Sequence, residues 1–184
     1  MISEADRKTL LGLARQSISH HLNRRALPEP DVAGILKERR GAFVTLKKHG
    51  DLRGCIGIID ARLPLWETVA EMAVSAAVHD TRFPPVTANE LPALSIEISV
   101  LSPFRRVADI AEIVVGRDGL MIRRGMRSGL LLPQVATEYG WDREEFLRHT
   151  SLKAGLDPDA WKGDVELSAF SAEIFHEPDG DARP

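Results

Sequence analysis

The segment LRGCIG, residues 52–57, holds the only cysteine of this chain and says most about its structure. Read as a β-strand, it places Arg53, Cys55 and Gly57 on one face, because side chains alternate along a strand. Glycine lets other groups come close to the backbone, and a neighbouring guanidinium favours the thiolate form of a cysteine. The segment therefore predicts the floor of a pocket that carries a candidate reactive group.

The segments on either side of LRGCIG carry both strand and helix patterns. Apolar residues recur at helical spacing up to about Asn23, and a second helix is predicted from Pro64 until the Pro84-Pro85 stop. Other predicted elements are strands over residues 41–48, 52–59, 94–100 and 165–175, a hairpin of residues 113–115 and 120–122, and helices from 133 and from 142 to 155. Strands joined by hairpins rather than by regular βαβ crossovers indicate an α+β fold with a mainly antiparallel sheet flanked by helices.

The bulk composition is that of an ordinary globular domain. The chain has 184 residues, of which 43% are hydrophobic and 28% charged. We expect one domain over residues 1–176 and a disordered tail over residues 177–184. The acidic N-terminus lacks the apolar core of a signal peptide, and no apolar run reaches the ~18 residues of a membrane span. We therefore expect a cytoplasmic protein that makes no membrane contact.

Charge and residue spacing disfavour several classes of function. The formal charge of −3 at pH 7 gives no overall attraction for nucleic acid. A single cysteine excludes an internal disulfide, and the six histidines lack metal-ligand spacing with a carboxylate or the cysteine. The glycines of residues 116–119 and 125–129 match neither a phosphate loop nor a dinucleotide fingerprint. We expect no metal site and no bound cofactor.

Two groups of residues are candidates for chemistry, and each has a structural alternative. Cys55 is a candidate nucleophile, but it also suits a small residue that fills a tight strand position. Asp80 and Arg82 stand where the second predicted helix ends, and an arginine there can clamp a carboxylate or phosphate. The two can also pair with each other and fix the loop. The residues alone leave both choices open.

The LRGCIG segment resembles the signature of the AMMECR family, whose bacterial and archaeal members are called AmmeMemoRadiSam system protein A. Further stretches match the family pattern in the same order, over about residues 4–176: DTRFPP (80–85), ELP (90–92), IEISVLS (96–102), GRDG (116–119), LPQVA (132–136) and KAGL (153–156). Prokaryotic members often carry a second cysteine just before KAGL, where this chain has Ser151-Leu152. A mechanism that needs two cysteines is therefore excluded.

The resemblance implies an α+β fold of a larger and a smaller lobe, with LRGCIG near the cleft between them. It also implies association with a Memo-like protein and a radical S-adenosylmethionine enzyme. We therefore predict a cytosolic accessory protein of that system, which binds a ligand or substrate segment around LRGCIG. Arg53 and Arg82 are expected to hold an anionic group, and Gly54 and Gly57 to open the backbone to it. Gln134, in the LPQVA stretch, completes the predicted ligand-binding set.

Two alternatives belong to other functional classes. In the first, the protein is a cysteine-dependent enzyme with Cys55 as nucleophile and Asp80 orienting a base. In the second, it is an adaptor or a weak nucleic-acid-binding module that works through the turn carrying Arg123, Arg124 and Arg127.

Overall fold

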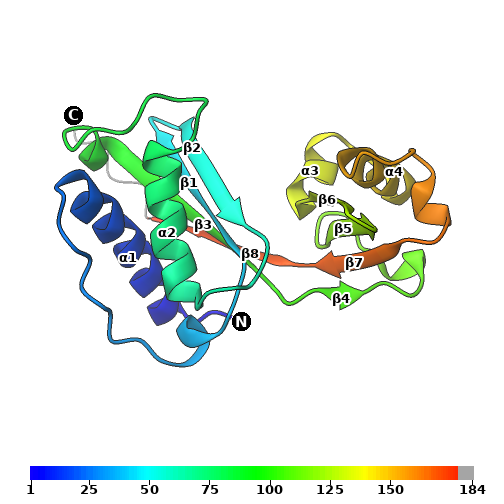
Figure 1. Ribbon diagram of the computed structural model, residues 1–184, viewed down its shortest axis with the longest axis horizontal. Helices are drawn as coiled ribbons and strands as arrows, with labels where there is room; N and C mark the ends of the chain where they lie inside the picture. Colours follow the sequence, from blue (N-terminus) through cyan, green and yellow to red (C-terminus); the bar gives the residue numbers. More distant parts are fainter. Residues whose placement is uncertain (178–184) are drawn as a thin grey trace. The chain divides into compact units, whose positions relative to one another are not determined.

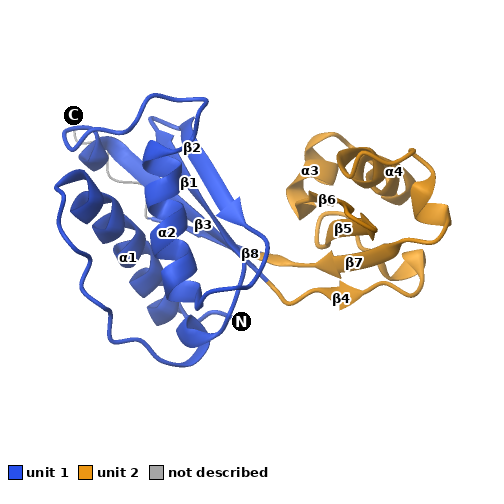
Figure 2. Cartoon of the chain, in the orientation of Figure 1, with its two compact units in different colours: residues 1–101, 173–184 blue, residues 102–172 orange. Residues whose placement is uncertain are grey.

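The computed structural model describes residues 1–177 and divides them into two compact units (Figures 1 and 2). Unit 1 comprises residues 1–101 together with the stretch from Glu173, and unit 2 comprises residues 102–172. Each unit contains an antiparallel four-stranded sheet and two of the four α-helices of the described chain. The α+β class and the division into a larger and a smaller part are confirmed. None of the described helices is long and apolar enough to cross a membrane.

Unit 1 is a four-stranded sheet whose one face is covered by two helices (Figure 1). The strand order is β2-β1-β3-β8, so β2 lies at an edge. The elements are α1 (Glu4–Leu22), η1 (Gly34–Lys37), β1 (Ala42–Lys48), β2 (Asp51–Ile58), α2 (Leu65–Val78), η2 (Leu91–Ala93), β3 (Leu94–Leu101) and β8 (Ala172–His176).

The core of unit 1 lies between this sheet and its helices. Ala42, Val44 and Leu46 alternate along β1 and are completely buried, which places them on the helix-covered face. The residues between them, such as Thr45, are only partly buried and belong to the opposite face. LRGCIG lies on β2 as predicted, and Cys55 is paired with Thr45 on that opposite face.

A two-residue turn joins β1 to β2. His49 and Gly50 have φ angles of 52° and 88°, the left-handed pair that a type I′ hairpin turn requires and that matches the twist of the strands. The register shifts between Leu46 and Lys47, so that Leu46 pairs with Gly54 and Lys47 with Leu52. Arg53 is the extra residue at this bulge.

Unit 2 packs two helices against a second sheet, of order β4-β7-β5-β6. Its elements are β4 (Arg105–Arg106), η3 (Ile110–Glu112), β5 (Gly119–Arg124), β6 (Arg127–Leu131), α3 (Pro133–Glu138), α4 (Arg143–Lys153), η4 (Ala160–Lys162) and β7 (Glu166–Phe170). Leu120 and Ile122 of β5 and Phe146 of α4 are completely buried in its core. A capping box of Asp142 and Glu145 begins α4, within the helix predicted from residue 142 to 155.

The predicted hairpin of residues 113–115 and 120–122 is wrong, because β5 pairs instead with β6. The Asp118-Gly119 pair that indicated a hairpin turn has another role. The buried Asp118 carboxylate accepts hydrogen bonds from the Val114 amide (2.9 Å) and from Arg105 and Arg117 (2.9 and 2.8 Å). These bonds close the preceding segment into a loop, so it does not pair as a strand.

The end of the described chain also differs from the prediction. The single strand predicted over residues 165–175 is two strands, β7 and β8, which belong to different sheets. Between them the Ser171 amide donates to Ser102 Oγ (2.9 Å). A disordered tail is predicted from Glu177, yet Glu177 accepts from Arg15 Nε (2.7 Å) and from the Ile96 amide (3.0 Å). The rest of that prediction, residues 178–184, lies outside the described residues.

Gly54 sets how closely α2 packs on β2. A Cβ atom at this position would lie 2.2 Å from the backbone oxygen of Ala76, closer than any side chain tolerates. We expect Gly54→Ala to lower the free energy of unfolding by about 2 kcal/mol or more, because the helix must move away from the strand. Urea titration measures this loss of stability, provided that the m value of the variant equals that of the parent protein.

Gly12 provides the matched control. It is exposed in α1, and a Cβ atom there meets nothing within 4 Å. We expect Gly12→Ala to stabilise the protein by about 0.5–1 kcal/mol, the usual gain for alanine over glycine in a helix. Equal effects of the two substitutions would contradict the close packing at Gly54.

Candidate ligand-binding site around Cys55

Cys55 is bound at the outer edge of the unit 1 sheet by two side chains. Its amide donates to Asp80 Oδ2 (2.8 Å), and its carbonyl accepts from Arg82 Nη2 (3.3 Å). Since β2 is an edge strand, these backbone groups face away from β1. Asp80 and Arg82 therefore occupy the place of a neighbouring strand and satisfy groups that would otherwise be open to another chain.

The end of α2 brings Asp80 to this edge. Residues before a proline avoid helical geometry, and α2 ends at Val78, ahead of the Pro84-Pro85 pair. The Phe83 amide then donates to the Asp80 carbonyl (3.1 Å), and the Val86 amide donates to the Ala77 carbonyl (2.8 Å). These bonds fold the loop back so that DTRFPP lies beside LRGCIG.

Asp80 and Arg82 pair with each other, one of the two arrangements that the sequence leaves open. Asp80 Oδ1 accepts from Arg82 Nε (2.9 Å) and Oδ2 accepts from Nη2 (2.7 Å), and only 4% of the Asp80 side chain is exposed. The bond from Arg82, with the amides of Cys55 and Arg82, holds the pKa of Asp80 well below its usual range despite burial. This carboxylate positions its neighbours and is a poor proton acceptor.

Arg53 is held in a second ion pair, with Glu90. Its Nε and Nη2 donate to the two Glu90 oxygens (2.9 and 3.1 Å), and Lys48 Nζ donates to the same carboxylate (3.0 Å). The bonds from Arg53 and then Lys48 lower the pKa of Glu90 to about 2. Glu90 belongs to the ELP stretch, and the sequence indicated no role for it.

One hydrogen-bond donor of the Arg53 side chain is not used by Glu90. The Arg53 side chain is 13% exposed, and its Nη1 atom is buried without a hydrogen-bond partner among residues 1–177. The Arg82 side chain is 55% exposed. Both guanidiniums lie over the ring of Phe83, at 5.9 Å for Arg53 and 5.5 Å for Arg82. Phe83 thus links the two predicted arginines.

The Cys55 thiol lies on the face of the sheet opposite the helices. Thr45 Oγ1 donates to Cys55 Sγ (3.2 Å), the one hydrogen bond of this sulfur within the described chain. Thr45 is paired with Glu97 on its other side, and Glu97 accepts from Lys47 Nζ (2.9 Å). A base that would activate Cys55 is not among the side chains bonded to it, so its role as a nucleophile stays a prediction.

Gly54 and Gly57 leave space that other parts of unit 1 occupy. The backbone of α2 lies against Gly54, and a Cβ atom on Gly57 would lie 2.2 Å from the Phe43 ring. Packing thus accounts for both glycines, and their contact with a ligand stays a prediction. Gln134 belongs to α3 in unit 2, whereas Arg53, Gly54, Gly57 and Arg82 belong to unit 1. Its Oε1 is buried and has no partner in the part of the chain described.

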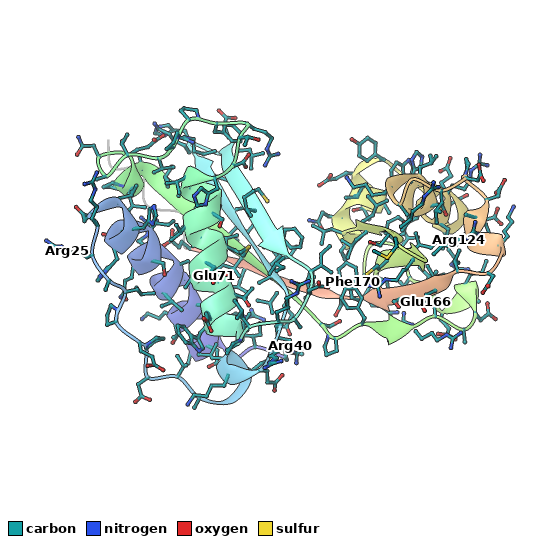
Figure 3. The ribbon with its side chains drawn as sticks, viewed as in Figure 1. Arg25, Arg40, Glu71, Arg124, Glu166 and Phe170 are labelled. Atoms are coloured by element: carbon teal, nitrogen blue, oxygen red, sulfur yellow. The ribbon has the colours of Figure 1, made fainter. Side chains whose placement is uncertain are left out.

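Two of the three arginines at the β5–β6 turn donate hydrogen bonds to backbone carbonyl groups. Arg124, labelled in Figure 3, donates from Nη2 to the Ala160 carbonyl (3.1 Å). Arg127 donates from Nη1 to the carbonyl of Gly155, just beyond α4 (3.0 Å). These bonds give two of the three arginines a structural role. Among residues 1–177, no three His, Cys, Asp or Glu side chains gather as metal ligands would.

Comparisons with known proteins agree with the motifs. Residues 11–175 match the family model described as AMMECR1. A protein of Methanothermobacter thermautotrophicus is 46% identical over 186 residues, covering 96% of this chain and 96% of that protein. A Thermococcus kodakarensis protein is 46% identical over 181 residues, covering 91% and 88%. The crystal structure of uncharacterized protein PH0010 from Pyrococcus horikoshii is similar, with a TM-score of 0.84, 42% identity and coverage of 96% and 93%.

The two ion pairs predict a loss of stability in acid. In the unfolded chain the pKa of a glutamate is ~4.3 and that of an aspartate ~3.9, whereas the pKa values of Glu90 and Asp80 are lower in the folded protein. Below about pH 5 the unfolded chain therefore binds more protons. We expect the free energy of unfolding to fall steadily as pH drops toward 2, measured by urea titration at several pH values.

Glu90→Gln isolates the contribution of the Arg53–Glu90 ion pair to the loss of stability in acid. This variant should be less stable at pH 7, because Arg53 loses its anionic partner, and its stability should fall less steeply in acid. Glu29→Gln, at an exposed position, is the control and should follow the parent protein. If Glu90→Gln and the parent protein lost stability in parallel below pH 5, the Arg53–Glu90 pair would not be the cause.

Proposed function

This chain belongs to the AMMECR1 family, and from that premise we propose that it is a cytosolic accessory protein that binds an anionic group. We place the binding at Arg53 and Arg82 in unit 1, and the anion on a small ligand or on a segment of a substrate protein. The partners we propose are a Memo-like protein and a radical S-adenosylmethionine enzyme, which the resemblance of the motifs implies.

The buried Nη1 of Arg53 is the observation that carries the proposal. Nε and Nη2 are fixed on Glu90, while Nη1 has no acceptor among the described residues. A buried donor without an acceptor costs about 1–3 kcal/mol. An anionic oxygen placed there would recover that cost and gain a charge-assisted hydrogen bond.

Arg82 supports the same ligand chemistry. Asp80 fixes Nε and Nη2, so the planar guanidinium is oriented before a ligand arrives. More than half of the side chain is exposed, which leaves it open to an incoming oxygen. The group as a whole has three cations, with Lys48 as the third, against the carboxylates of Asp80 and Glu90. A net positive charge favours an anion.

The same geometry supports binding over proton transfer. Both carboxylates have pKa values well below the usual range, and each is engaged by cationic side chains. A general base works best with a pKa near the working pH. Asp80 and Glu90 are instead suited to holding arginines in place for a partner.

Direct binding measurements test the proposal. We expect calorimetry with the purified Memo-like protein or radical S-adenosylmethionine enzyme of the same organism to show saturable binding. Arg82→Ala should weaken it about tenfold or more, because a charge-assisted hydrogen bond is lost. Failure of both proteins to bind, or full affinity of Arg82→Ala, would contradict the proposal.

Arg62→Ala is the matched control, since Arg62 pairs with Asp60 as Arg82 pairs with Asp80, two residues apart. Arg62 is 74% exposed and lies outside the proposed site, so binding should be unchanged. Circular dichroism and the urea midpoint of each variant separate a lost contact from a lost fold.

A further inference from the structure

Unit 2 carries three stacked aromatic rings that the proposed function does not use. The Trp141 and His149 rings are parallel, with centroids 3.8 Å apart and an interplanar angle of 3°. The Tyr139 and Trp141 rings stack at 4.9 Å with an angle of 17°. Tyr139 is the C-cap residue of α3, Trp141 lies in the short connection, and His149 comes from α4. Three separate positions of the chain thus build one platform.

The platform is fixed on the protein and open to solvent. Trp141 is partly buried and packs against the core of unit 2, whereas 68% of Tyr139 is exposed. Gly140, between them, has a φ angle of 66°, a left-handed turn that places both rings side by side. A large aromatic ring held rigidly in water is a preorganised contact surface, because its conformational entropy is already lost.

The segment that carries the platform is mainly acidic. Residues 138–149 hold four exposed carboxylates against two guanidiniums. The carboxylates are Glu138, Asp142, Glu144 and Glu145. Of the guanidiniums, Arg143 donates to the Ile113 carbonyl (3.0 Å), while Arg148 is exposed. The local charge therefore favours a cationic partner, opposite in sign to the group proposed for the Arg53–Arg82 site.

We propose that this surface, Tyr139-Trp141-His149 with its carboxylates, binds an arginine-containing segment of a partner protein. The arginine guanidinium stacks on the exposed Tyr139 ring, and neighbouring carboxylates neutralise its charge. Arginine suits this surface better than lysine, because its guanidinium is planar, weakly hydrated and stacks on aromatic faces. The inference is independent of the proposed function, since it concerns another unit and a ligand of the opposite charge.

A peptide titration followed by NMR tests the inference. The probe is acetyl-GRGRGRG-amide, added to the ¹⁵N-labelled full chain, with lysine and citrulline versions of the same peptide for comparison. We expect saturable shifts confined to the amides of residues 138–149 and the Trp141 indole N–H. The lysine peptide should bind more weakly than the arginine peptide, and the uncharged citrulline peptide should not bind. The affinity for the arginine peptide should fall as the salt concentration rises.

Variants at Tyr139 decide whether the ring carries the binding. Tyr139→Ala should lower the affinity for the arginine peptide about three- to fivefold. Tyr139→Phe, which keeps the ring, should bind the peptide as the parent protein does. Both substitutions are at an exposed position, and the amide spectrum itself reports whether the fold is intact. Absence of shifts at millimolar peptide, shifts elsewhere in the chain, or unchanged affinity of Tyr139→Ala would overturn the inference.

Discussion

The Asp80 carboxylate holds the Cys55 amide and the Arg82 guanidinium at the same time, and the rest of the site depends on that bond. Through it the loop after α2 becomes the outer neighbour of an edge strand. Arg82 and Phe83 are brought next to LRGCIG, and the Phe83 ring then lies under Arg53 as well. Two motifs that are 25 residues apart in the sequence thus form one structural group. Without the carboxylate, the Cys55 amide would be an unpaired donor at the open edge of the sheet.

The charges of the group explain why we favour recognition over catalysis. Each predicted arginine is oriented by its own carboxylate, Arg53 by Glu90 and Arg82 by Asp80. Ion pairs of this kind fix the orientation of each guanidinium, and the N–H groups that are not bonded to the carboxylates are the ones available to a ligand. Arg53 contributes a buried donor and Arg82 an exposed one. On this proposal an anion that enters from solvent meets Arg82 first and then the buried donor of Arg53.

Local signals predicted most of the fold, and long-range contacts account for what they missed. The β1–β2 hairpin and the helix α4 depend on signals in neighbouring residues, the His49-Gly50 turn and the Asp142–Glu145 cap, so the sequence located both elements. Glu90 pairs with Arg53 across 37 positions, and no spacing rule connects them. The Asp118-Gly119 pair indicated a hairpin, but tertiary ion pairs changed its role. Ser171 breaks the last predicted strand where the chain passes from one sheet to the other.

Hydrogen exchange at the Cys55 amide tests most directly whether Asp80 closes the edge of β2. This N–H faces away from β1, and Asp80 is the acceptor that the structure provides for it. If the bond persists in solution, the amide should exchange as slowly as the amides bonded between β1 and β2. Exchange as fast as that of an unpaired edge amide would mean that Asp80 does not hold the strand, and the arrangement of Arg82 and Phe83 would lose its basis.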